Sequence, residues 1–391
     1  MRIALFSWET LHSIAVGGVA PHVTGLASAL CRRGHDVHVF TRIGEGQSRF
    51  EQVNGVSYHR CPFEFHPDLV EETGRMCDSL VWHFGEVEAS LGGREFDLVH
   101  GHDWLCARAL VQAKNHHRKP VVMTVHSTEY GRCGNQHCPG RSQQISHVEW
   151  EGTFVSNQVI CVSHALRKEV QEIYRVPADK LSTVYNGVDP HRYDEPVNPG
   201  EVRATYGAGS RDPVVLFVGR MAWQKGPDLL LHTVPGLLRH HPNAKFVFVG
   251  DGNMLADLQR QAVKLGIAHS TRFLGHRNGQ DLVSLFKSAD LVCVPSRNEP
   301  FGIVILEAWS AAKPVVATRN GGPAEFVTHG YDGLVVSDST EALGWGVGTT
   351  LADFEHARWM GLNGRVQAES RFSWDTIALE TERVYTVAVQ E

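Results

Sequence analysis

Residues 291–318 read LVCVPSRNEPFGIVILEAWSAAKPVVAT. The apolar run LVCVPS predicts a buried strand that ends in a polar loop containing Glu299. Pro300 and Gly302 predict a turn, and the following apolar run predicts a helix that begins near Ile303. PVVAT predicts the next strand. A helix between two apolar strands is the repeating unit of a parallel sheet covered by helices.

The same alternation continues on both sides of this stretch. Towards the N-terminus of the chain the predicted strands are RIALFSW, DVHVFTR, FDLVHGH, PVVMTVH and QVICVS, and the later ones are PVVLFVGR, AKFVFVGD, TRFLGH and GLVV. Residues 190–213, rich in Pro, Gly and charge, predict a linker between two domains. We therefore expect an α/β protein with two doubly wound, Rossmann-like domains, residues 1–192 and 193–370. Since open α/β sheets bind ligands at the carboxyl ends of their strands, two such domains imply a central cleft.

The last segment, residues 371–391, predicts an amphipathic helix. We expect four of its apolar side chains to pack against one of the domains: Trp374, Ile377, Leu379 and Val384.

Composition excludes several classes of protein. With 391 residues and a net charge of −6, the chain does not resemble a basic nucleic-acid binder. It contains no run of 18 apolar residues, and MRIALFSW reads as a buried strand rather than a signal peptide. Eight scattered cysteines, several within apolar runs, predict reduced thiols. We expect a cytoplasmic protein with at most peripheral membrane contact.

Two carboxylates mark the stretch quoted above. Glu307 lies about one turn into the predicted helix, on the same face as Ile303. The amides of Gly302, Ile303 and Val304 are unpaired donors at a helix N-terminus, which is a ready anion site. Carboxylates suit sugar or ribose hydroxyls, and amides suit phosphate. The structural alternative places Glu307 on a solvated helix face.

Cations and glycines follow two further strands. In VVLFVGRMAWQKGP, Arg220 and Lys225 come after the strand that ends at Gly219 and are predicted to clamp a diphosphate, the alternative being ordinary surface cations. Gly17 and Gly18 follow the first strand and predict a turn that approaches a phosphate closely or is purely structural.

The motifs HGHDW and TVHSTEYGR also follow strands. They place His102, Asp103, His126 and Glu129 at the predicted cleft, where His126 would orient a sugar hydroxyl or the acceptor. The chain has 23 histidines, so a structural role is the alternative for each of them.

Two observations concern metals. Cys133, His137, Cys138 and His147 lie close in sequence, but the C-x4-C spacing without a second pair fits a loop beside the acceptor better than a zinc site. No Asp-x-Asp pair occurs in the sequence, so we expect no metal cofactor at the diphosphate.

Taken together, these motifs resemble the retaining GT-B glycosyltransferases of family 4, also called group 1. The resemblance covers nearly the whole chain. It rests on E-x7-E from Glu299 to Glu307, GG at 17–18, G-R-x4-K from Gly219 to Lys225 and NGVD at 186–189.

The resemblance implies a role for each of these positions. Arg220 and Lys225 would bind the donor diphosphate, Glu307 the ribose and Glu299 the transferred sugar. His126 would contact that sugar, Arg277 the base, and the last helix would return to the first domain. The implied catalytic residues are Glu299, His126, Lys225 and Arg220; the implied donor-binding residues are Gly17, Gly18, Gly219, Arg277, Phe301, Gly302, Ile303, Val304 and Glu307; the implied acceptor-side residues are His102, Asp103 and Glu129.

The HGHDW and TVHSTEYGR motifs lean towards the glycogen- and starch-synthase-like branch. Those enzymes resemble K-x-G-G-L at the first loop, and the position of its lysine is Ala15 in this chain. Their bacterial forms tend to have Cys where this chain has Phe301. A small or lipid-linked acceptor is therefore expected, with UDP-glucose as the default donor and guanosine or adenosine as other bases.

Alternatives remain at this point. The first is elongation of an α-glucan. A nucleotide-sugar 2-epimerase of the same fold would consume the donor without an acceptor. A nicotinamide-dependent oxidoreductase would have to use VGDGNM at 249–254, which lacks the third Gly of a dinucleotide motif. A non-catalytic sugar-nucleotide sensor would need fewer of these residues.

Overall fold

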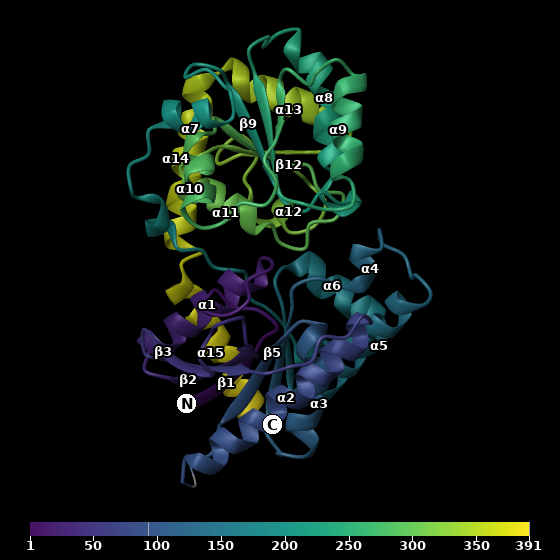
Figure 1. The fold of residues 1–391 in the computed structure, drawn as a ribbon, viewed down its shortest axis with the longest axis vertical. Coiled ribbons are helices and arrows are strands. Elements are labelled where there is room, and N and C mark those ends of the chain that lie inside the picture. The colour runs from purple at the N-terminus through teal and green to yellow at the C-terminus, as the bar shows by residue number, and fades with distance from the viewer. Residues whose placement is uncertain (93, 391) are drawn as a thin grey trace. The chain divides into compact units, whose positions relative to one another are not determined.

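The computed structural model describes residues 1–92 and 94–390, which divide into two compact units. The N-terminal unit contains Met1–Gly187 and the segment from Trp374 onward, and the C-terminal unit contains Val188–Ser373 (Figure 1). The sequence placed the change of domain after residue 192 and the last helix from 371, so the boundaries differ by a few residues. Glu391, the last residue of that predicted segment, lies outside the described residues.

In the described part of the N-terminal unit, eight strands form a sheet with the order β3-β4-β2-β1-β5-β6-β7-β8. All neighbours pair in parallel except β3 and β4. The strands are β1 (Arg2–Phe6), β2 (Asp36–Arg42), β3 (Phe50–Val53), β4 (Val56–Cys61), β5 (Leu98–His102), β6 (Val121–Val125), β7 (Gln158–Cys161) and β8 (Leu181–Thr183). Its helices are α1 (Val19–Arg32), α2 (Leu69–Ser90), η1 (Trp104–Cys106), α3 (Ala107–Asn115), α4 (Glu129–Arg132), α5 (Arg141–Val155), α6 (His164–Tyr174), η2 (Ala178–Lys180) and α15 (Trp374–Gln390).

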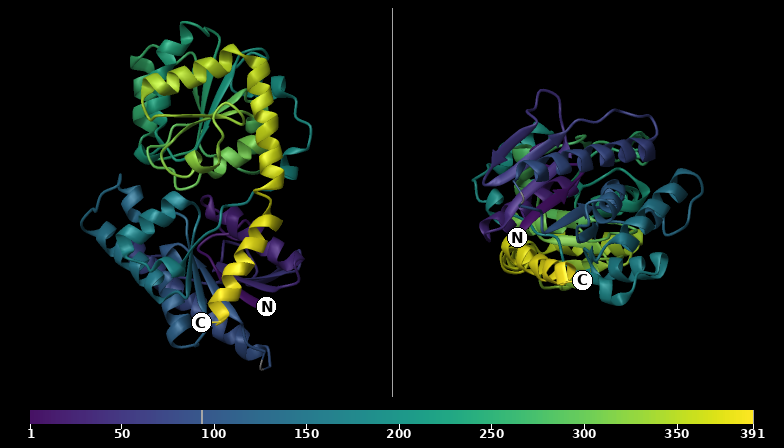
Figure 2. Two further views of the ribbon diagram at one scale, coloured as in Figure 1. Left: turned by 180° about the vertical axis from the view of Figure 1, so that it is seen from behind. Right: turned by 90° about the horizontal axis from the view of Figure 1, so that it is seen from below.

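Alternation along β1 separates the two faces of this sheet. Ile3 and Leu5 join a core with α1 and α15, whereas Phe6 packs edge-on against Phe84 of α2 at 5.7 Å between ring centroids. Helix α15 lies beside α1 within this unit, as the left view of Figure 2 shows. Its Ile377 and Val384 are buried as expected, but Leu379 is 39% exposed, so that part of the expectation is wrong.

In the described part of the C-terminal unit, six parallel strands have the order β11-β10-β9-β12-β13-β14. They are β9 (Val214–Val218), β10 (Lys245–Val249), β11 (Thr271–Phe273), β12 (Leu291–Val294), β13 (Val315–Thr318) and β14 (Leu334–Val336). The helices are η3 (Pro190–Tyr193), α7 (Pro199–Thr205), η4 (Trp223–Lys225), α8 (Pro227–Leu238), α9 (Leu255–Lys264), α10 (Gly279–Ser288), α11 (Ile303–Ser310), α12 (Pro323–Phe326), α13 (Thr340–Ala352) and α14 (Phe354–Ser370). Helices α8, α9 and α13 share one core with the sheet. The predicted linker 190–213 thus contains η3 and α7 rather than irregular chain.

The fold class is confirmed: both units are doubly wound sheets of the Rossmann type. Among the parallel strands of each sheet the order reverses once, between β1 and β5 and between β9 and β12. Ligands of open α/β sheets bind at the carboxyl ends of the strands beside such a reversal. Among the described residues, no helix is both long and apolar enough to cross a bilayer.

Candidate functional site

The reversal between β9 and β12 brings a lysine and a glutamate together. Lys225, in η4 after β9, places its Nζ 2.9 and 2.8 Å from the two carboxylate oxygens of Glu299, in the loop after β12. The hydroxyl of Ser296 donates to the same carboxylate at 2.8 Å. Two residues predicted from separate motifs therefore form one charged pair at the edge of the sheet where a ligand is expected.

Arg297 ties the two loops to each other. Its guanidinium donates to the Asp228 carboxylate at 2.9 and 2.6 Å, and it lies 5.0 Å over the ring of Trp223. Gly226 has φ +63°, and a Cβ there would lie 2.1 Å from the carbonyl oxygen of Pro295. The loops after β9 and β12 are therefore held in contact, which fixes the Lys225–Glu299 pair.

The loop after β13 supports Glu299 from the other side. The amide of Glu299 donates to the Asn320 carbonyl at 3.0 Å, and the amide of Gly322 donates to the Glu299 carbonyl at 2.9 Å. Gly321 has φ +102°, and a Cβ there would lie 2.1 Å from the Glu299 carbonyl oxygen. Only glycine fits at this position without moving Glu299.

We expect Gly321→Ala to destabilise the protein by about 2 kcal/mol or more, because it combines a strained φ with a backbone clash. Gly266→Ala is the matched control, since Gly266 also has positive φ but meets nothing within 4 Å of an added Cβ. Denaturant unfolding measures both variants. Equal destabilisation by the two substitutions would show that the contact with Glu299 contributes nothing.

Helix α11 begins directly after this loop. Gly302 is its N-cap with φ +105°, and no side chain of the described residues caps the helix. The first turn therefore presents the amides of Ile303 and Val304 as an anion site. The side chain of Phe301 instead packs into the core, 5.0 Å from the Phe326 ring. Phe301 could therefore contact a nucleotide-sugar donor only through its backbone.

Glu307, in the middle of α11, lies in a partly enclosed position. Burial raises the pKa of its carboxyl to about 7, and the charge of Arg192 and a hydrogen bond from the Tyr193 hydroxyl only partly oppose this. Both partners belong to η3, in the segment that the sequence treated as a linker, so sequence reasoning missed them. At neutral pH this carboxyl is close to half-ionised and can respond to a ligand.

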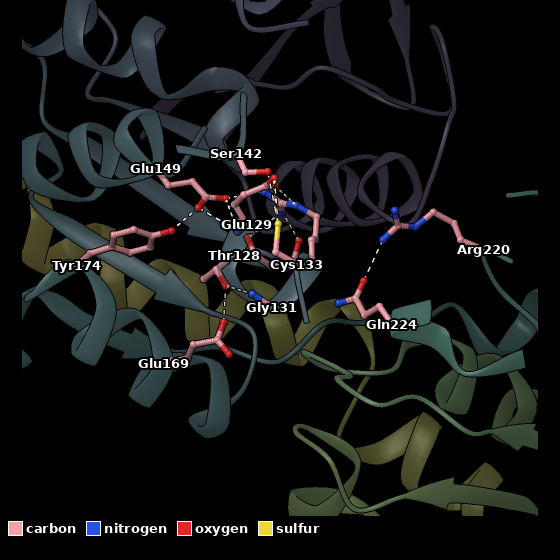
Figure 3. A network of polar contacts seen from close by, with 12 residues as sticks. Thr128, Glu129, Gly131, Cys133, Ser142, Glu149, Glu169, Tyr174, Arg220 and Gln224 are labelled. Carbon is pink, nitrogen blue, oxygen red and sulfur yellow. Dashed lines mark hydrogen bonds and ion pairs between the residues drawn. The ribbon is translucent and has the colours of Figure 1, made fainter. Parts of the chain in front are cut away.

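The two remaining predicted cations have other hydrogen-bond partners. Arg220 donates to the side chain of Gln224 at 3.0 Å (Figure 3). Arg277 is exposed in the loop after the edge strand β11 and donates to the His276 carbonyl at 3.1 Å. The strand order puts Arg277 two strands away from β9, at the margin of the anion site.

In the N-terminal unit, a buried carboxylate already engages the diglycine turn. Glu9, in the loop after β1, accepts hydrogen bonds from the amides of Val16 and Gly17 at 2.5 and 2.7 Å. Gly18 is the N-cap of α1. A phosphate that bound the Gly17 amide would have to displace Glu9, a residue that no sequence motif pointed to.

His126 follows β6 and is held by Asp103, which follows β5. The His126 amide donates to the Asp103 carboxylate at 2.7 Å, and burial raises the pKa of Asp103 to about 6. The buried His102 places its Nδ1 3.3 Å from His126 Nε2. Burial lowers the pKa of His126 to about 3, so its imidazole is neutral at physiological pH. Asp103 and His102 thus position His126.

Glu129 takes part in an internal network (Figure 3). Its carboxylate accepts from Arg132 at 2.9 Å, while its amide donates to the buried Glu149 at 3.0 Å. Glu149 also accepts from Arg132 at 2.7 Å and from the hydroxyl of Tyr174. This network fixes the loop after His126. The free thiol of Cys133 adjoins it, 3.6 Å from Glu129, and Cys138 is free as well.

Comparisons with known proteins agree with this geometry. Residues 16–192 match the family model Glycosyltransferase Family 4, and residues 200–367 match Glycosyl transferases group 1. An uncharacterised glycosyltransferase of Methanocaldococcus jannaschii is 37% identical over 100% of this chain and 99% of its own length. A glycogen synthase of Mycobacterium tuberculosis is 30% identical over 99% and 95%. A D-inositol 3-phosphate glycosyltransferase of Corynebacterium jeikeium is 32% identical over 98% and 96%.

Solved structures agree on the fold. The chain is similar to a sucrose-phosphate synthase of Thermosynechococcus elongatus with a TM-score of 0.79 and 24% identity, covering 98% of both chains. It is also similar to the catalytic domain of starch synthase IV from Arabidopsis thaliana, bound to ADP and acarbose, with a TM-score of 0.79 and 17% identity over 100% and 99% of the two chains. The chain therefore belongs to the GT-B glycosyltransferases of family 4, on the side of the family that leans towards the glycogen synthases.

Proposed function

We propose that this glycosyltransferase moves a hexose from a nucleoside diphosphate sugar, by default UDP-glucose, to a small or lipid-linked acceptor, with retention of anomeric configuration and without a metal. The observation that carries the proposal is the Lys225–Glu299 pair at the β9/β12 reversal, beside the N-terminus of α11.

The donor diphosphate would bind the ammonium group of Lys225 in place of Glu299. Its negative charge competes with Glu299 for the ammonium group, while the amides of Ile303 and Val304 and the guanidinium of Arg220 supply further positive potential. These groups stabilise the charge that develops on the leaving diphosphate. They provide the electrostatic role that a divalent cation has in metal-dependent transferases, which is the basis for proposing that no metal is required.

Glu299 would then bind the transferred sugar. Once Lys225 turns to the phosphate, the carboxylate can accept hydrogen bonds from sugar hydroxyls and stabilise positive charge at the anomeric carbon. In that state the carboxylate hydrogen-bonds to Ser296 and to sugar hydroxyls, which makes it a poor nucleophile and favours front-face attack over a covalent glycosyl-enzyme. The leaving phosphate would accept the proton of the acceptor. Neutral His126 would hydrogen-bond to the sugar, and Glu307 would accept from ribose hydroxyls.

A second acceptor class is favoured by one comparison. The similarity to a glycogen synthase extends over nearly the whole chain, so elongation of an α-glucan is the alternative. Incubation of the enzyme with labelled donor and either a glycogen primer or inositol 3-phosphate separates the acceptor classes. Proton NMR of the product gives its anomeric configuration. An α-linked product from an α-linked donor supports retention, and a β-linked product excludes it.

Affinity for the donor should fall as the pH drops through about 7, because Glu307 binds hydroxyls best when ionised and its pKa is raised to about 7. The limiting slope is about tenfold per pH unit. Calorimetric titration with the nucleotide sugar avoids the terminal phosphate of a free nucleoside diphosphate, which titrates in the same range. Glu307→Gln should bind more weakly and lose this pH dependence. An unchanged slope in Glu307→Gln would remove Glu307 from the nucleotide site.

A further inference from the structure

Three histidines of the N-terminal unit meet at the β1/β5 reversal. His22 comes from α1, His102 ends β5 and His126 follows β6. One ring nitrogen of each lies within 4.8 Å of the others, and among residues 1–92 and 94–390 no other group of three or more potential metal-ligating side chains is this close. The His22 and His126 ring centroids are 4.5 Å apart.

Several nitrogens of this cluster lack hydrogen-bond partners. His22 is 4% exposed, and within the described chain the Asn186 side chain can bond only one of its two ring nitrogens, while Nε2 of His102 has no partner. The neighbouring His100 differs, because its two nitrogens each lie 2.7 Å from a hydroxyl, of Tyr385 and of Thr124. A buried ring nitrogen without a partner is unfavourable, so a nitrogen of His22 is available to bind a ligand.

The imidazoles are also in the form that binds metals. Burial lowers the pKa of His22, His102 and His126, so all three are neutral at physiological pH and keep a lone pair for coordination. Nitrogen ligands of this type suit Zn²⁺ and similar divalent transition metals, not Mg²⁺ or Ca²⁺.

We propose that His22, His102 and His126 form a binding site for one Zn²⁺ ion. Zn–N bonds of about 2.0–2.1 Å in a tetrahedral site place ligand nitrogens roughly 3.4 Å apart. His102 Nδ1 and His126 Nε2 are already at 3.3 Å, so only His22 has to approach. The hydrogen atom between these two nitrogens moves to the other nitrogen of its own ring when that ring changes tautomer. Both facing nitrogens then have a lone pair for the ion, and no net proton is released. His126 is partly exposed, which gives the ion an entry path and leaves its fourth position to water.

Occupation of this site has a consequence for catalysis, and this part rests on the proposed function. A Zn²⁺ ion that binds Nε2 of His126 replaces the contact with His102 that positions the ring for the transferred sugar. Zn²⁺ is therefore an inhibitor of glycosyl transfer, and a chelator restores the rate. The ion is not a cofactor, because the donor diphosphate is assigned to Lys225 and α11 in the other unit.

Calorimetric titration of the metal-stripped full chain with ZnCl₂ tests the site without any turnover. We expect one equivalent bound, and an affinity about 100-fold weaker in both His22→Ala and His102→Ala. The titrations use a Cys133→Ser/Cys138→Ser background, which removes two partly exposed thiols that could also bind Zn²⁺. His59→Gln is the matched control. His59 pairs with His38 at 2.9 Å in the same unit but does not belong to the histidine triad, so the variant should bind Zn²⁺ with unchanged affinity.

Circular dichroism and thermal melting establish that each variant is folded, and His22→Gln replaces His22→Ala if the latter is not. Binding of less than one equivalent, or equal affinity in the wild type and both triad variants, overturns the site. If Zn²⁺ binds as expected but does not slow an enzyme that turns over its donor, the inhibitory role falls and the metal site stands. Absence of donor turnover contradicts the proposed function alone, since the calorimetry does not depend on it.

Discussion

Lys225→Ala should lower turnover of the nucleotide sugar by about 10³-fold, since one preorganised charged donor at a developing anion contributes on this scale. Lys225 is the residue whose ammonium group meets Glu299 and would meet the leaving diphosphate. Steady-state release of nucleoside diphosphate at saturating donor measures the effect. Lys225→Arg keeps the charge, and we expect it to recover part of the lost rate because its fork geometry differs from that of an ammonium group.

The same substitution affects stability, and this must be separated from catalysis. Removing Lys225 leaves the buried Glu299 carboxylate without its counter-charge, which should destabilise the protein by about 2 kcal/mol, less than for a fully buried pair because the lysine side chain is 23% exposed. Lys225→Ala/Glu299→Gln should restore stability but not turnover. If Lys225→Ala keeps turnover within tenfold of the wild type, the lysine is structural and the donor binds elsewhere.

Trp309→Ala should destabilise the protein by about 4 kcal/mol, the usual scale for removing a buried Trp. Trp309 lies on α11, is fully buried and donates its indole N–H to the Asp332 carbonyl at 2.8 Å. Its ring packs 5.7 Å from Phe326, which in turn contacts Phe301 at the start of the helix. Loss of the indole therefore loosens the helix whose N-terminus is assigned to the diphosphate.

Denaturant unfolding measures this effect, with Trp345→Ala as the matched control in the same unit. Trp345 is 53% exposed, so its removal should change the free energy of unfolding by no more than about 0.5 kcal/mol. Similar values for the two variants would contradict the packing described for α11.

Much of the fold could be predicted because buried parallel strands are continuous apolar runs, and every strand predicted from such a run is present. Three strands, β3, β4 and β8, were missed, although the sequence carries a signal for the first two. Asn54 and Gly55 have φ +52° and +84°, the pattern of a two-residue hairpin turn, and Asn-Gly is its strongest sequence marker. The expected burial of Leu379 was also wrong, because this residue lies on a different face of α15 from the buried Ile377, Thr381 and Val384.

The residues of the candidate site could be predicted from the sequence, but the contacts between them could not. Lys225 and Glu299 each stood out within a motif, yet their pairing spans 74 residues and depends on the order of β9 and β12. Tyr193 lies in a polar segment that gave no reason to expect a contact with Glu307. Neither the contacts of Glu9 nor the partners of the His22 ring could be predicted, because hydrogen-bond satisfaction is a property of the packed chain.

The most direct test of the central claim is release of nucleoside diphosphate from a donor panel, with and without EDTA. The panel contains UDP-, GDP- and ADP-glucose, UDP-N-acetylglucosamine and GDP-mannose. We predict that one donor is hydrolysed slowly, that EDTA does not change the rate, and that Lys225→Ala abolishes it. If no donor is hydrolysed and none raises the melting temperature of the wild-type protein, the assignment of the β9/β12 reversal as a nucleotide-sugar site is contradicted.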